Sequence, residues 1–86
     1  MEYINTVGRR KTSVARLYMK PGKGSFVING LELDKYFSSE LMRLIVEQPL
    51  KTVDALNSFD FKVNIYGGGL KGQAEAIRLA VSRALV

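Results

Sequence analysis

Apolar and polar residues alternate along four short stretches of the chain, which predicts four β-strands. Successive side chains of a strand point to opposite faces of its sheet, so a period of two residues is typical of a strand with one buried face. The predicted strands cover residues 3–8, 13–20, 25–28 and 59–66. A Pro-Gly turn follows the second strand, and an Asn-Gly dipeptide follows the third. We therefore expect the first three strands to form a meander.

The two longest predicted strands separate their side chains by chemistry. The strand at 13–20 has an apolar face with Ala15, Leu17 and Met19 and a polar face with Arg16, Tyr18 and Lys20. The strand at 59–66 has an apolar face with Phe59, Phe61, Val63 and Ile65. Its polar face carries Asp60, Lys62, Asn64 and Tyr66. Burial of both apolar faces would leave a mainly basic face open to solvent.

Two further stretches have helical spacing. Residues 38–48 are expected to form a helix that Ser38 or Ser39 caps and Pro49 ends. The apolar stripe of this helix is predicted to be Leu41, Leu44 and Ile45. From Gln73 onward, the predicted stripe of a second helix consists of Ala74, Ile77, Val81 and Ala84. Between the strands and the first helix, residues 31–37 are expected to be a loop with one helical turn.

The element order is therefore β-β-β-α-β-α, in a single domain that covers residues 1–86. One sheet with both helices on its apolar face would bury every stripe. The predicted fold is an α+β two-layer sandwich. Its open sheet face would carry Arg16, Tyr18, Lys20 and Lys62.

The net charge of +5 is distributed unevenly along the 86 residues. Residues 1–24 hold six cations against one acid, whereas residues 25–66 hold four cations against six acids. Residues 67–86 are basic again. Cations gathered in two glycine-containing regions indicate a polyanionic partner.

The composition also excludes several classes of site. The chain has no cysteine and no histidine, which excludes disulfides, thiolate metal sites and the commonest acid–base catalyst. We expect no catalytic residue, no metal and no cofactor. No apolar run is long enough for a membrane span and the start does not resemble a secretory signal, so the cytoplasm is the expected location.

The glycine-rich stretch at residues 66–73 connects the last strand to the last helix. Glycines allow the backbone to approach a phosphate, and a helix N-terminus adds unpaired N–H donors. Gly67, Gly69 and Gly72 match the dinucleotide-binding pattern G-x-G-x-x-G, but the following strand and acidic residue of that motif are missing. A nucleotide-binding fragment remains an alternative. Glycines that only turn the chain are a second alternative.

The stretch GRRKTSVAR at residues 8–16 is the other candidate for phosphate contacts. Arginine can grip a phosphate with two hydrogen bonds, and hydroxyl groups add donors. A solvated charged turn is the alternative, and the second basic turn at residues 20–24 weakens it. Tyr18 and Tyr66 lie on the polar strand face and could stack on bases. The carboxylates, Asp60 among them, form no acid–base pair or metal site and are expected to be solvated.

Several long motifs resemble the family of the bacterial-type ninth protein of the small ribosomal subunit. The matching segments are TVGRRKTSVARLYMKPGKGSFVING, YF at 36–37, QPL at 48–50 and GGGLKGQAEAIRLAVSRAL. The resemblance runs from about residue 3 to the end. It implies the same sandwich fold and a non-enzymatic, structural role in the head of the subunit, with ribosomal RNA and neighbouring ribosomal proteins as partners.

The resemblance also assigns the basic and glycine segments to RNA. Together with the phosphate argument, it gives the predicted RNA-binding residues Gly8, Arg9, Arg10, Lys11, Thr12, Ser13, Arg16, Tyr18, Lys20, Lys23, Gly67, Gly68, Gly69, Lys71, Gly72 and Gln73. Family members continue into a basic C-terminal tail that reaches towards transfer RNA, and this chain does not contain it. The last helix is still on its apolar pattern at Leu85, so we expect that Val86 is not the natural terminus.

Overall fold

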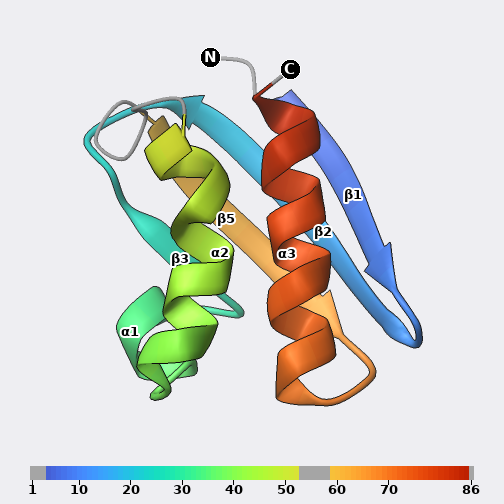
Figure 1. The fold of residues 1–86 in the computed structure, drawn as a ribbon. Coiled ribbons are helices and arrows are strands. Elements are labelled where there is room, and N and C mark those ends of the chain that lie inside the picture. The colour runs from blue at the N-terminus through green and yellow to red at the C-terminus, as the bar shows by residue number, and fades with distance from the viewer. Residues whose placement is uncertain (1–3, 53–58, 86) are drawn as a thin grey trace.

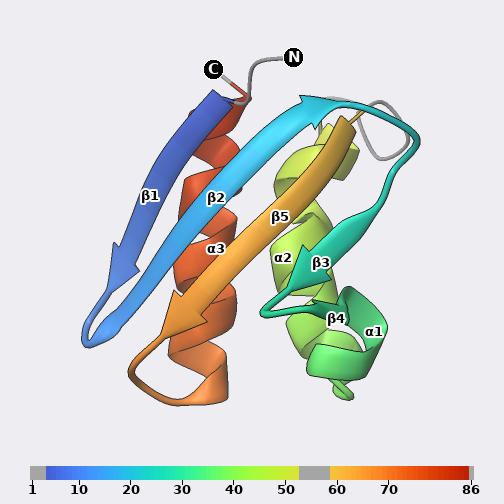
Figure 2. The same ribbon diagram turned by 180° about the vertical axis from the view of Figure 1, so that it is seen from behind.

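The computed structural model describes residues 4–52 and 59–85, which form two layers. The elements are β1 (Ile4–Arg10), β2 (Ser13–Pro21), β3 (Phe26–Ile28), β4 (Leu31–Glu32), α1 (Leu33–Tyr36), α2 (Glu40–Thr52), β5 (Phe59–Tyr66) and α3 (Leu70–Ala84). All three helices lie on one face of a five-stranded sheet (Figure 1), and the other face is open (Figure 2). The predicted α+β two-layer sandwich is confirmed.

The strand order in the sheet is β1-β2-β5-β3-β4, so the expected meander of the first three strands is wrong. β5 lies between β2 and β3, antiparallel to β2 and parallel to β3. The reason is length, since β5 pairs with eight residues of β2 whereas β3 has only three residues to offer. A central position also buries the apolar face of β5, which was predicted residue for residue.

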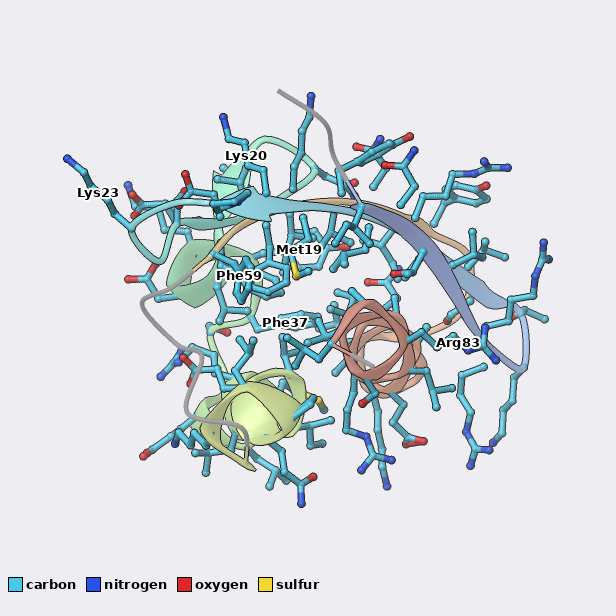
Figure 3. The ribbon with its side chains drawn as sticks, turned by 90° about the horizontal axis from the view of Figure 1, so that it is seen from above. Met19, Lys20, Lys23, Phe37, Phe59 and Arg83 are labelled. Carbon is cyan, nitrogen blue, oxygen red and sulfur yellow. The ribbon has the colours of Figure 1, made fainter. Side chains whose placement is uncertain are left out.

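The core lies between the sheet and the helices. Ala15, Leu17 and Met19 of β2 face the layer of helices, as predicted, together with the apolar face of β5. Figure 3 shows Met19, Phe59 and Phe37 between the two layers, and Lys20 and Lys23 beyond the sheet. The interior therefore uses one face of β2 and one face of β5, and the polar faces of these strands lie on the open side of the sheet.

β1 lies unusually close to α3, because Gly8 has no side chain. A Cβ at Gly8 would overlap the backbone of α3 at Ala76 and Ala80. Next to it, the Thr6 hydroxyl donates a hydrogen bond of 2.7 Å to the carbonyl of Ala80. The predicted stripe of α3 is buried against this strand and β2, which confirms Ala74, Ile77, Val81 and Ala84 as core residues.

The apolar stripe and the end of α2 both differ from expectation. Leu41 and Leu44 are 63% and 45% exposed, whereas Val46 and Leu50 are buried. Pro49 lies inside the helix, which continues to Thr52. Proline lacks an N–H and forfeits one helical hydrogen bond, but the additional turn brings Leu50 into the core. Burial of such a side chain is worth about 1.5–3 kcal/mol.

The other helix boundaries lie closer to the predicted ones. Ser39 is the serine at the start of α2, where its hydroxyl accepts a long hydrogen bond of 3.4 Å from the Met42 N–H. α1 is the single helical turn that was expected, although the short strand β4 before it was not. α3 begins at Leu70, earlier than predicted. None of the helices in the described part of the chain has the length and apolarity to cross a membrane.

Candidate functional site

The turn between β1 and β2 and the glycine loop between β5 and α3 lie side by side at one end of the sheet (Figures 1 and 2). Together they enclose an open pocket of about 280 Å³. Its lining consists of Arg10, Lys11, Thr12, Ser13, Gly68, Gly69, Lys71, Gly72 and Glu75. The two segments singled out in the sequence therefore form one site, because β2 and β5 pair antiparallel and bring Val14 opposite Tyr66.

Glycine is required at the start of the loop. Gly67 and Gly68 both have positive φ, at 80° and 64°, which side-chain-bearing residues rarely adopt. A Cβ at Gly67 would overlap the Thr12 carbonyl, and one at Gly68 would overlap the Ser13 hydroxyl. Gly69 is different, because its φ is −90° and a Cβ there would meet nothing within 4 Å. The loop is therefore packed tightly on the β1–β2 turn up to Gly68 and opens to solvent at Gly69.

A hydrogen-bond network holds the glycine loop at the Gly67 carbonyl. The Gly67 carbonyl accepts hydrogen bonds from the Ser13 hydroxyl at 3.1 Å and from the Gln73 side-chain amide at 3.0 Å. Ser13 is only 1% exposed, so its role in this structure is to hold the loop. The Tyr36 hydroxyl in turn donates to the Gln73 side-chain oxygen at 2.8 Å.

The start of α3 makes the pocket electropositive. Gly69 precedes the helix without a side-chain cap, and the first turn contains no acid. The first N–H groups of an α-helix have no acceptor within the helix and carry a partial positive charge. Lys11 and Lys71 add exposed full charges. One side is closed by the ion pair between Arg10 Nε and Glu75 Oε1 at 2.9 Å, so Arg10 is partly neutralised.

The open face of the sheet is basic. The strand registers place Arg9, Arg16, Lys20 and Lys62 on it, with Tyr18 and Tyr66 among them. Arg16 Nε donates a hydrogen bond of 3.3 Å to the Tyr66 hydroxyl, and this bond raises the pKa of Arg16. Lys20 lies seven positions after Ser13 along β2, which corresponds to roughly 23 Å at the usual strand rise. The site is thus an extended basic surface with a pocket at one end.

The second basic turn, predicted at residues 20–24, lies at residues 22–25 because β2 continues to Pro21. A side chain of the protein itself binds its backbone. Asp60 Oδ1 accepts hydrogen bonds from the backbone N–H groups of Lys23, Gly24 and Ser25 at 3.0–3.2 Å. The bonds from Ser25 and Lys23 hold the pKa of Asp60 below its ordinary value. The expectation that Asp60 is merely solvated is therefore wrong. Its signal in the sequence is a single acid among the cations Arg16, Lys20 and Lys62 of the predicted open sheet face.

A family model described as "Ribosomal protein S9/S16" matches residues 8–86. The chain belongs to this family. It is 55% identical to the small ribosomal subunit protein uS9 of Amoebophilus asiaticus over 85 residues, which cover 99% of the chain and 66% of that protein. The proteins of the same name from Cytophaga hutchinsonii and Porphyromonas gingivalis are 55% and 52% identical over 86 residues, which cover 100% of the chain and 67% of each relative.

The resemblance found in the sequence is thus confirmed, and the chain spans about two thirds of the length of these relatives. Their names describe ribosomal proteins, which are structural components and not enzymes.

Not every predicted site residue of this family member lies at the pocket. Gly8 is buried against α3, and the Gln73 side chain binds the Gly67 carbonyl outside the pocket lining. Ser13 lines the pocket, but it is nearly buried and its hydroxyl is bound to the same carbonyl. Lys20 and Lys23 lie towards the opposite end of β2. In the described part of the chain, no three acidic side chains come together in a way that could hold a metal ion.

Proposed function

We propose that this chain is a structural component of the small ribosomal subunit, in the cytoplasm, that binds ribosomal RNA with its pocket and its open sheet face. The names of its relatives support a place in the small ribosomal subunit. The sequence resemblance implies that this place is the head of the subunit, with other ribosomal proteins as neighbours. Contact with transfer RNA is assigned to a tail outside this chain. The observation that carries RNA binding is the pocket, where two basic segments and a helix N-terminus meet.

The mechanism is a clamp on the RNA backbone. Lys11, Lys71 and the first N–H groups of α3 bind phosphate oxygens at the pocket. Arg16 and Lys62 neutralise further phosphates along the sheet, and Tyr18 and Tyr66 offer rings on which unpaired bases stack. Since the pocket and the far end of β2 are about 23 Å apart by strand rise, one rigid domain holds separate phosphates at a fixed distance. Assembly and stability of the RNA are the result.

The test compares two pairs of lysine substitutions in binding to a transcript of bacterial small-subunit ribosomal RNA. Lys11→Ala with Lys71→Ala removes two cations from the pocket. Lys35→Ala with Lys51→Ala removes two exposed cations from the helical layer and serves as the matched control. RNA affinity falls as salt rises, and each lost phosphate contact should reduce the steepness of log affinity against log salt by about 0.7–0.9. We expect this loss for the pocket pair only.

Equal slopes for both pairs would contradict the proposed interface. A titration with ATP covers the alternative function, because saturable binding at micromolar concentration would favour a nucleotide site at residues 67–72.

A further inference from the structure

We infer that Tyr36 is a positioning residue for the RNA-binding loop, acting through Gln73. This inference rests on the proposed function. Tyr36 is the last residue of α1, lies outside the pocket lining and carries no charge, so neither the basic pattern nor the glycine pattern points to it. Its hydroxyl nevertheless connects α1 to the loop by a short chain of hydrogen bonds.

The chain of bonds has three groups in sequence. The Tyr36 hydroxyl donates to Gln73 Oε1 at 2.8 Å, and Gln73 Nε2 donates to the Gly67 carbonyl at 3.0 Å. The hydroxyl thus occupies the acceptor end of the amide, which leaves the donor end directed at the loop. Without that partner, Gln73 has a single bond to the loop and greater freedom to rotate into solvent.

The Gly67 carbonyl is the point at which orientation is set. A peptide unit is planar and trans, so its C=O and N–H point in opposite directions. Holding the Gly67 oxygen towards Ser13 and Gln73 therefore also fixes the direction of the Gly68 N–H. Gly68 lines the pocket. Because both glycines have positive φ and no side chain to restrict them, the backbone depends on these bonds for a single conformation.

Tyr36 itself is held firmly enough to serve as an anchor. It is half-buried and packs against the core, and its ring meets the buried ring of Phe37 edge to face, with 4.9 Å between the centroids. Tyr36→Phe keeps this ring packing and removes only the hydroxyl. The substitution therefore isolates the hydrogen bond from the fold.

The experiment is a double-mutant cycle with the same ribosomal RNA transcript. We expect Tyr36→Phe to weaken RNA binding about two- to tenfold, which corresponds to the usual contribution of one hydrogen bond. The salt slope should stay as in the parent, because no cation is lost. In a Gln73→Met background, which keeps the side-chain volume, Tyr36→Phe should have no further effect, because Tyr36 acts only through the amide.

The inference is overturned by unchanged affinity of Tyr36→Phe, or by an equal loss in the presence and absence of Gln73. A reduced salt slope would equally overturn it, since that would indicate a lost phosphate contact. The proposed function fails separately, if the parent chain shows no salt-dependent binding to the RNA. Melting temperatures measured on all four proteins identify any loss that comes from unfolding.

Discussion

The turn at residues 22–25 and the loop at residues 67–72 have similar sequences, and both follow a long strand of the sheet. Each combines glycine with lysine, and each directs backbone N–H groups at an anion or at the space for one. In the first turn the anion is Asp60 of β5, which three N–H groups bind. In the second, the first turn of α3 contains no acid, and Gly69 faces open space.

We infer from this difference that a basic glycine turn is available to an external phosphate only where no acid of the chain already binds its backbone N–H groups. The turn at residues 22–25 keeps its shape without RNA and offers only the exposed side chain of Lys23. In the loop at residues 67–72, the Gly67 carbonyl is hydrogen-bonded to Ser13 and Gln73. The first turn of α3 contains no acid that could bind its N–H groups. The two turns should therefore respond in opposite ways to substitution.

The largest expected effect is on folding, at the packed base of the loop. Gly67→Ala should lower the free energy of unfolding by about 2–4 kcal/mol, because it adds left-handed strain of about 1–2 kcal/mol and overlap with the Thr12 carbonyl. Urea denaturation measures the change. Gly30→Ala is the control, since Gly30 has a similar φ of 84° but a Cβ there would meet nothing. Equal losses would show that the loop does not depend on its contact with Thr12.

An intermediate effect is expected at the occupied turn. Asp60→Ala should lower the melting temperature, because three backbone donors lose their acceptor. It should also raise RNA affinity, because these donors become available to phosphate and a negative charge is removed. Asn64→Ala is the matched control, since Asn64 is exposed on the same face of β5. Tighter RNA binding by both variants, or by neither, would contradict the assigned role of Asp60.

Protonation of Asp60 at low pH should destabilise the parent protein, as the substitution Asp60→Ala does. The pKa of Asp60 is lowered in the folded state, so its stabilising contribution is complete above the ordinary value of 3.8. The contribution is lost as the pH falls through the folded-state pKa. The difference in melting temperature between the parent and Asp60→Ala should therefore shrink as the pH falls below about 4.

The smallest effect on stability is expected at Gly69. Its backbone is in the extended region and its Cβ position is open, so Gly69→Ala and Gly69→Val should each change the free energy of unfolding by less than about 1 kcal/mol. RNA affinity should nevertheless fall, and more for valine than for alanine, because the side chain occupies the space through which a phosphate approaches. Parental affinity in a folded valine variant would leave the loop with a packing role alone.

Local patterns predicted most of the fold, and distant contacts account for what they missed. The alternation in residues 59–66 is strict, so β5 was predicted to the residue. α2 has apolar residues on both sides, and nothing in its own sequence tells Leu41 and Leu44 from Val46 and Leu50. Only the position of the sheet decides between them. The insertion of β5 between β2 and β3 likewise depends on strand lengths across the whole chain.

The candidate site shows the same division. Its basic and glycine segments were predicted, because cations and glycines are conspicuous in a short sequence. That they share one pocket follows from the pairing of β2 with β5. The contacts of Asp60, Glu75 and Tyr36 were not predicted, because each depends on a partner remote in the sequence. The two acids and the tyrosine are therefore the part of the candidate site that required a structure.

The most direct test of the account is a backbone amide NMR titration of the chain with a fragment of bacterial small-subunit ribosomal RNA. It reports on both glycine turns in one experiment. We predict that the amides of Thr12, Gly68, Gly69 and Lys71 shift on RNA binding, while those of Gly24 and Ser25 stay in place because Asp60 retains them. Shifts at Gly24 and Ser25 without shifts at Gly68 and Gly69 would contradict the assignment of the open loop as the phosphate site.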